Sequence, residues 1–320
     1  MNAIIDSQID WAKLHQYKVP IIQLLRTTAW EPQHARADRI EACGTQVSIG
    51  RCKACGKAHV LTANYCRDRF CPICQYKLSR KRFRAMALAL EHVDMTNRVV
   101  LFATLTVRNP TPERFAFTLD AMSDGFVKWC KALDYEGHIE GYARSLEVTY
   151  NAKAGTFHPH YHVILVGERK GPYGYLTTEH CTAVWRRSLN LDYDPQCDVR
   201  ASYSKGGFVD EAGGAILETF KYIIKPDTAL AKMPPEDAYY FVTGLSGRRA
   251  VSFGGVLRDA MRAVKIEDLA TQGQGPNMIC ECGTQMEVFT LLWSSGEGAY
   301  KAYQEALGVK QPDWKSDNLG

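Results

Sequence analysis

The sequence predicts an α+β fold, in which a ferredoxin-like antiparallel sheet forms the centre and helices pack on one of its faces. Segments typical of strands and helices follow each other between residues 98 and 225, in the order strand, helix, strand, strand, helix, strand, helix. Within that order, the apolar run 157–166 carries three alternate histidines, His158, His160 and His162. We expect this histidine strand to be a central strand of the sheet.

The histidine strand has two different faces. Side chains alternate along a strand, so the three histidines share one face, while Tyr161, Val163 and Leu165 share the other and suit a core. Imidazole is the commonest side-chain metal ligand, and paired histidines at the head of an apolar strand indicate a metal site. The alternative is a half-buried strand whose histidines are solvated or satisfied by neighbours.

The strand that precedes the histidine strand carries Glu147 and is joined to it by a short polar turn. If Tyr150 pairs with Phe157 across that turn, Glu147 lies opposite His160. A register slip of two residues places it opposite His162. In either register the carboxylate shares the histidine face and lies within reach of the same ion. The alternative is an exposed acidic residue on a strand.

The other elements of this region have recognisable signals. Residues 98–108 are β-branched and aromatic, as expected of a buried central strand. Thr111, Pro112 and Glu113 supply an N-cap, a proline at the first helical position and an early acidic residue, which together begin a helix. Further segments follow in the order helix, strand and helix, at residues 177–190, 196–202 and 215–225.

The last of these helices carries an acidic residue and a tyrosine on one face. Glu218 and Tyr222 are four positions apart, and Lys221 and Lys225 lie beside them. Pro226 ends the helix. Taken alone, a tyrosine beside lysines is typical of an amphipathic helix flank.

Composition places the chain among ordinary globular proteins. The net charge of +4 permits a nucleic-acid partner without arguing for one. No apolar run approaches the roughly 20 residues that span a bilayer, and the first residues lack the pattern of a secretory signal. Eleven cysteines, odd in number and grouped in pairs, favour reduced thiols that hold metal. We therefore expect a cytoplasmic protein with no membrane association.

Two CxxC pairs, at residues 52–55 and 71–74, are separated by a spacing typical of zinc sites. Two thiols three positions apart in a tight turn reach one tetrahedral ion, and a second such turn closes the site, which makes the zinc structural. The predicted ligands are Cys52, Cys55, Cys71 and Cys74, with Cys66 and His59 as spare candidates. Cys280 and Cys282 form half of a similar motif, and their role stays open.

A basic helix is predicted directly after the second CxxC pair. Its positive residues recur at helical spacing and share one face; they are Lys77, Arg80, Lys81 and Arg84. Such a charge run is usually a solvated helix face. Beside a zinc site, contact with DNA phosphates is an equally good interpretation.

Four segments together resemble the replication initiator (Rep) proteins of rolling-circle plasmids, within the His-hydrophobic-His (HUH) endonuclease superfamily. The matching segments are residues 102–107, 158–163, 218–222 and the cysteine segment 66–74. The resemblance covers roughly residues 40–260. It implies a helical and Cys-rich zinc-binding region at 1–95, an HUH endonuclease domain at 96–230 and a C-terminal accessory region at 231–320.

The resemblance also implies a mechanism. His160 and His162, with Glu147 as third ligand, hold Mg²⁺ or Mn²⁺ and leave open positions for the scissile phosphate. Tyr222 attacks the phosphate, which gives a 5′-phosphotyrosine and a free 3′-hydroxyl. Glu218 then activates water for a terminating hydrolysis. Lys221 and Lys225 assist the phenol and contact DNA.

The implied partners are single-stranded and supercoiled plasmid origin DNA. Helicase and DNA polymerase come from the host, since the sequence carries no G-x-x-x-x-G-K-[ST] phosphate loop. One alternative is an HUH transposase or mobilisation relaxase, although no second tyrosine lies within a turn of Tyr222. An alternative of another class is a non-enzymatic zinc DNA-binding regulator.

Overall fold

The computed structural model describes residues 11–56, 58–168, 176–201, 232–264, 279–280 and 282–302. The chain divides into two compact units. One combines residues 1–23, 30–74 and 270–320, and the other combines residues 24–29 and 75–269. This division differs from the three contiguous regions expected from the sequence, because a C-terminal strand pairs with an N-terminal one. Within the described ranges, none of the helices has the length and apolar character required to cross a membrane.

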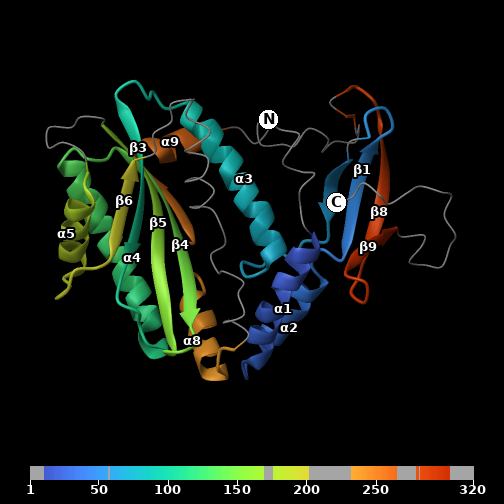
Figure 1. Cartoon of the computed structure of the whole chain (residues 1–320), viewed down its shortest axis with the longest axis horizontal. Coiled ribbons are helices and arrows are strands. Elements are labelled where there is room, and N and C mark those ends of the chain that lie inside the picture. The colour runs from blue at the N-terminus through green and yellow to red at the C-terminus, as the bar shows by residue number, and fades with distance from the viewer. Residues whose placement is uncertain are drawn as a thin grey trace. The chain divides into compact units, whose positions relative to one another are not determined.

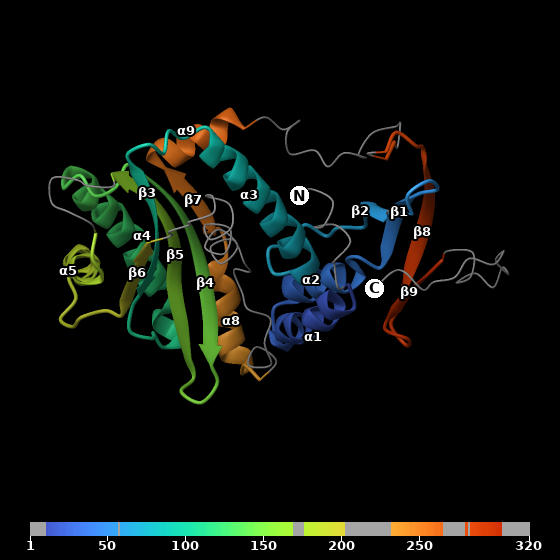
Figure 2. The same ribbon diagram turned by 45° about the horizontal axis from the view of Figure 1, so that its top comes forward.

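The larger unit is built on a five-stranded antiparallel sheet with the strand order β6-β3-β5-β4-β7 (Figure 1). The histidine strand is β5, and it occupies the centre of the sheet as expected. Figure 2 shows the short strand β7 beside β4. The strands span Arg98–Thr106 (β3), Gly141–Asn151 (β4), Thr156–Glu168 (β5), Cys197–Ala201 (β6) and Val251–Gly254 (β7).

Aromatic side chains fill the interface between one face of this sheet and helices α4, α5 and α8. Tyr161 of β5 lies with its ring 5.6 Å from Phe126 of α4 and 6.5 Å from Trp185 of α5. Phe157 packs between Phe115 of α4 and Phe241 of α8. The helices span Pro112–Tyr135 (α4), Thr178–Leu189 (α5) and Pro235–Leu245 (α8). The α4 start agrees with the predicted one, with Thr111 as N-cap.

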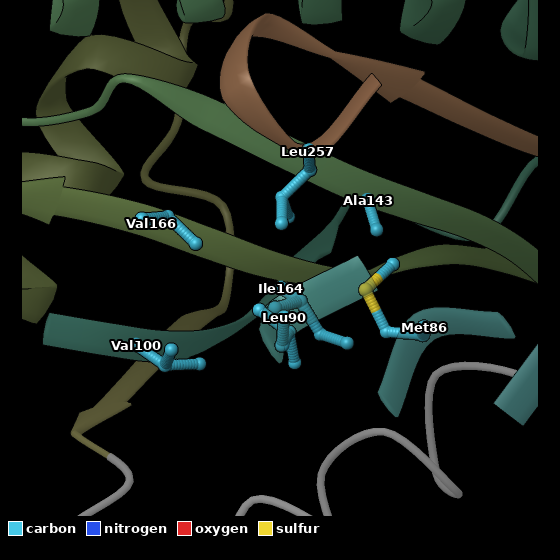
Figure 3. Packing of buried hydrophobic residues seen from close by; sticks show 7 residues of the cluster. All are labelled: Met86, Leu90, Val100, Ala143, Ile164, Val166 and Leu257. Carbon is cyan, nitrogen blue, oxygen red and sulfur yellow. The ribbon is translucent and has the colours of Figure 1, made fainter. Parts of the chain in front are cut away.

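The opposite face of the sheet is also covered, over part of its length, by helices α3 (Pro72–Glu91) and α9 (Gly255–Ala263). Met86 and Leu90 of α3 and Leu257 of α9 pack on this face (Figure 3). Their partners on the strands are Val100, Ala143, Ile164 and Val166. The expectation of helices on one face only is therefore wrong. The apolar half of this face, beyond the histidines, needs its own cover.

The smaller unit contains a four-stranded sheet with the order β2-β1-β8-β9. Val47 and Ile49 of β1 and Leu291 of β8 form its small core, and His15 of α1 stacks on Trp293 at 3.9 Å. The strands span Gln46–Cys52 (β1), Ala58–Ala63 (β2), Met286–Ser294 (β8) and Ala299–Ala302 (β9). The N-terminal helices span Trp11–Thr27 (α1) and Glu31–Ala42 (α2).

A single methyl group at Gly167 tests the packing at the end of the histidine strand. A Cβ there would lie 2.0 Å from the carbonyl oxygen of His138, so Gly167→Ala must displace backbone. We expect the free energy of unfolding to fall by about 1–3 kcal/mol, as for overpacked cores. Urea unfolding followed by circular dichroism measures it. Gly296→Ala is the control, since its Cβ meets nothing within 4 Å. Equal unfolding midpoints for the two variants would contradict this packing.

Candidate metal and nucleic-acid sites

Strand pairing brings Glu147 beside the histidines of β5. Glu147 of β4 lies directly opposite His160, and Tyr150 lies opposite Phe157. This is the first of the two registers considered from the sequence. Because facing residues of paired strands project to the same side, the carboxylate joins the histidine face of the sheet.

The turn between β4 and β5 holds this register. The Asn151 carbonyl accepts hydrogen bonds from the backbone N–H groups of Ala154 and Gly155. The Asn151 side-chain oxygen accepts a further bond from the N–H of Lys153. Gly155 has a φ of +60°, a conformation that glycine adopts without strain. The polar turn seen in the sequence is thus a tight hydrogen-bonded one.

Three potential ligand atoms converge on this face. His162 Nε2 lies 3.1 Å from Glu147 Oε2 and 3.1 Å from His160 Nε2. His160 Nε2 is 3.7 Å from the same carboxylate oxygen. Two imidazoles and one carboxylate form a donor set that suits a divalent cation and leaves coordination positions open. The geometry therefore supports a metal site, without naming the metal.

The two histidines are nearly buried, and they keep Glu147 ionised. His160 and His162 are only 9% and 8% exposed. Burial raises the pKa of the Glu147 carboxyl, but hydrogen bonds and charge from the two histidines outweigh it, so its pKa lies well below the ordinary value. The carboxylate is therefore ionised at neutral pH, as a metal ligand must be. Within the described residues, Nδ1 of His162 has no hydrogen-bond partner, and the ring stacks on Phe102 at 5.6 Å.

The third histidine of the strand has a different environment. His158 Nδ1 lies 2.7 Å from the side-chain oxygen of Asn109, which follows the neighbouring strand β3 by three residues. His158 lies outside the group of three converging donors. Burial, and then the charge of His160, lower the pKa of its imidazole. His158 therefore flanks the group formed by Glu147, His160 and His162.

The other catalytic residues expected from the sequence lie outside the described residues. These are Glu218, Lys221, Tyr222 and Lys225, all between the end of β6 and residue 232. Their assignment stays a prediction.

The predicted basic helix is α3, which runs without interruption from Pro72 to Glu91. Lys77 and Lys81 are exposed on it, and Arg80 and Arg84 are half-buried. The helix places these four residues on successive turns of one side, as expected from their spacing.

The cysteines form two groups, and the expected single group of Cys52, Cys55, Cys71 and Cys74 is wrong. The first group consists of Cys43, Cys66, Cys71 and Cys74, and the second of Cys52, Cys55, Cys280 and Cys282. Cys66, a spare candidate, is thus a member of the first group. The side chain of His59, the other spare candidate, lies outside the described part of the chain.

The β1–β2 hairpin explains this separation. The first CxxC pair lies at the turn of the hairpin, where β1 ends. Strand β2 then runs antiparallel to β1 and carries the chain back to the start of β1, next to Cys43. The second CxxC pair therefore lies at the opposite end of the hairpin from the first. Strand β8 pairs with β1 so that Met286 faces Cys52, which brings Cys280 and Cys282 to the turn end.

The first cysteine group is enclosed by short-range contacts. Cys74 Sγ lies 3.6 Å from Cys43 Sγ and 3.7 Å from Cys66 Sγ. The backbone N–H of Cys66 donates to Cys43 Sγ, and that of Arg67 donates to Cys74 Sγ. N–H groups directed at sulfur stabilise thiolates, the form that binds metal. Thiol hydrogen bonds, that of Cys43 foremost, lower the pKa of Cys74, whereas thiol hydrogen bonds raise the pKa of Cys43 and Cys71.

A partly buried ion pair supports the loop of this first group. Arg36 of α2 reaches both oxygens of Asp68, at 2.6 and 2.9 Å. Asp68 in turn accepts the backbone N–H of Phe70, and the Arg36 guanidinium lies 4.3 Å from the Phe70 ring centre. These contacts hold the cysteine loop of residues 66–74 against α2.

Sequence reasoning missed Cys43 and a further cluster in the larger unit. Cys43 has no CxxC partner, so only its place in the fold reveals it. Glu136 Oε2 lies 2.6 Å from His180 Nε2 and 4.0 Å from His138 Nε2. Glu136 also forms an ion pair with Arg187 at 3.6 Å. This ion pair balances the negative charge of Glu136 without a metal ion. The Glu-x-His spacing at 136–138 was the only sequence signal.

Comparisons with known proteins give a consistent relationship. The family model described as "Replication protein" matches residues 57–300, more than half of the chain. A "Protein rep" of Bacillus amyloliquefaciens is 29% identical over 252 residues, which cover 73% of this chain and 74% of that protein. A "Protein rep" of Bacillus sp is 29% identical over 266 residues, which cover 77% and 86%.

A "Protein rep" of Streptococcus pneumoniae is 27% identical over 241 residues, which cover 72% of this chain and 73% of that protein. No solved structure matches the chain significantly. The family match includes the whole five-stranded sheet and the three converging donors on its central strands. The chain belongs to the replication protein family, the Rep initiators of rolling-circle plasmid replication.

Proposed function

We propose that this initiator nicks plasmid origin DNA in a metal-dependent reaction, through a covalent 5′-phosphotyrosine intermediate. The observation that carries the proposal is the convergence of His160, His162 and Glu147 on the central strands of the sheet. The order β6-β3-β5-β4, with α4 and α5 as connections, supports a ferredoxin-like HUH domain. Family membership supplies the DNA substrate class.

His160, His162 and Glu147 are proposed to hold Mg²⁺ or Mn²⁺. When bound, such an ion polarises the scissile phosphate and neutralises the charge that develops on it. The protein contributes a rigid frame for this set. Both histidines lie on one strand, the carboxylate lies on its partner, and the side chains are nearly buried. Little reorganisation is then needed when substrate binds.

Tyr222 is the proposed nucleophile. Its phenol oxygen attacks phosphorus, the bond from phosphorus to the 3′-oxygen breaks, and the 3′-hydroxyl leaves as a primer for DNA synthesis. The phenol proton must be lost, and a free phenol has a pKa of about 10. Lys221 and Lys225 lie one residue before it and three after it, where positive charge favours the phenolate. Glu218 is proposed to activate water for the hydrolysis that ends the round.

The remaining residues are proposed to organise DNA contact. Lys77, Arg80, Lys81 and Arg84 of α3 suit phosphates of the DNA backbone. The first cysteine group is proposed to hold a structural zinc ion. Three of its cysteines precede α3, and Cys74 lies in the first turn of that helix. A DNA polymerase must extend the free 3′-hydroxyl, and a helicase must separate the strands of the plasmid duplex ahead of it. The host enzymes are therefore the proposed partners.

Replacement of the nucleophile tests the covalent step. Tyr222→Phe removes the attacking oxygen, and we expect the covalent protein–DNA adduct on a supercoiled origin plasmid to disappear. Denaturing protein gels of internally labelled plasmid, digested with nuclease after the reaction, measure the adduct. Tyr239→Phe is the matched control, because Tyr239 is an exposed tyrosine on α8. An adduct that persists in Tyr222→Phe would refute the assignment.

The same assay separates the competing functions. A regulator of plasmid DNA without enzymatic activity binds the origin but never nicks it, with or without Mn²⁺. A transposase or relaxase forms the adduct on element ends or transfer origins, and not on a replication origin.

Removal of a donor tests the metal site. His162→Ala is expected to reduce Mn²⁺-dependent nicking by more than about 100-fold, since loss of even an outer partner of a metal ligand costs about 10–100-fold. Nicking rates over a range of Mn²⁺ concentrations measure this effect. His92→Ala, an exposed histidine after α3, is the control. Unchanged metal dependence in His162→Ala would exclude this site.

Glu218→Ala tests the terminating step. We expect the first nick to form at the normal rate, while water-dependent release of the adduct falls by about 10²–10⁴-fold, the usual contribution of a general base. Single-turnover assays that follow adduct formation and decay separate the two rates. Glu236→Ala, an exposed acidic residue on α8, serves as control. Equal loss of both steps would contradict the assigned role.

A further inference from the structure

The second cysteine group brings together two segments that are more than two hundred residues apart in the sequence. Cys52 Sγ lies 3.4 Å from Cys282 Sγ, and Cys55 Sγ lies 3.4 Å from Cys280 Sγ. Cys52 ends β1, whereas Cys280 and Cys282 directly precede β8, its neighbour in the sheet. The proposed nicking mechanism uses none of these residues.

Both halves of this group end at a glycine that directly follows the second cysteine. The Gly56 N–H donates to the Cys52 carbonyl at 3.0 Å, and the Gly283 N–H donates to the Cys280 carbonyl at 2.8 Å. Gly56 has a φ of +71° and Gly283 a φ of +81°, the left-handed conformation that glycine adopts without strain. Each turn thus presents two thiols on one side and closes on a glycine directly after its second cysteine.

The sulfur positions fit a metal better than disulfides. A disulfide requires about 2.05 Å between sulfurs, far shorter than the separations here. Zinc with four bonds of about 2.3 Å to thiolates sets the sulfurs about 3.8 Å apart in a tetrahedron. The first group has 3.6 and 3.7 Å for the same contacts, and the second is only slightly tighter.

Backbone pairing of β1 with β8 holds these segments together, but the described residues add only a small apolar core to it. Cys52 and Cys280 are 1% and 3% exposed and share a small apolar cluster with Met286. The core of the sheet between β1 and β8 is also small, with Val47, Ile49 and Leu291 as its fully buried members. A metal ion compensates for a core of this size, as in other small domains.

We propose that Cys52, Cys55, Cys280 and Cys282 bind a second structural zinc ion, which fastens the C-terminal hairpin β8–β9 to β1. The proposal gives a role to the half-motif at residues 280–282. It is independent of the nicking mechanism, because it predicts metal content and local order and makes no claim about catalysis. On this proposal, the described residues form two tetrathiolate sites, one at each end of the β1–β2 hairpin.

Metal content of the full-length protein tests this proposal. We expect Cys282→Ser to hold one fewer zinc ion per chain than the wild type, and Cys74→Ser also one fewer, by elemental mass spectrometry. The double variant should lose both. Cys130→Ser is the matched control, because Cys130 lies in neither group. Undiminished zinc in Cys282→Ser overturns the proposal, as do disulfides Cys52–Cys282 and Cys55–Cys280 in non-reducing peptide maps.

Hydrogen exchange supplies a second readout that does not depend on zinc counting. In Cys282→Ser, amides of β8 should exchange faster than in the wild type, while β3 and β5 of the larger unit keep their protection. Protection of β3 and β5 shows that the variant is folded. Equal exchange rates of the β8 amides in the variant and the wild type would contradict a structural zinc ion at the second cysteine group. Loss of nicking with intact β8 protection and zinc content would affect the proposed function only.

Discussion

The pairing of β4 with β5 is the constraint on which the candidate site depends. A slip of one residue in this register would turn Glu147 away from the histidine face, since side chains alternate along a strand. The hydrogen-bonded turn headed by Asn151 holds the strands in place, and Glu147 lies opposite His160. The three donors therefore come together through local pairing, since two consecutive strands and the turn between them are sufficient.

The same strand also organises the core. Its histidine face continues into Ile164 and Val166, which α3 and α9 cover, while Tyr161 faces α4 and α5 on the other side. Strand β5 thus carries two of the three donors and packs against helices on both faces of the sheet. Packing on both faces holds the donors in place, which suits the proposed reaction, in which charge develops on a phosphate.

Local sequence patterns predicted the elements around the candidate metal site, whereas strand pairings between distant segments were not predicted. The order of the described elements between residues 98 and 201 and the central position of the histidine strand were predicted, and alternation placed Glu147 on the histidine face in both registers considered. The grouping of the cysteines depends on β1–β8 pairing across more than two hundred residues, which spacing does not encode. The helices on the second face were not predicted, because the basic residues of α3 drew attention away from its apolar side, which carries Met86 and Leu90.

The most direct measurement of the central claim is the anomalous diffraction of crystals soaked in Mn²⁺. The account predicts one strong anomalous peak within bonding distance of His160 Nε2, His162 Nε2 and a Glu147 carboxylate oxygen, and its loss in Glu147→Ala. A peak elsewhere, with no density among these three side chains in protein that nicks DNA, would contradict it.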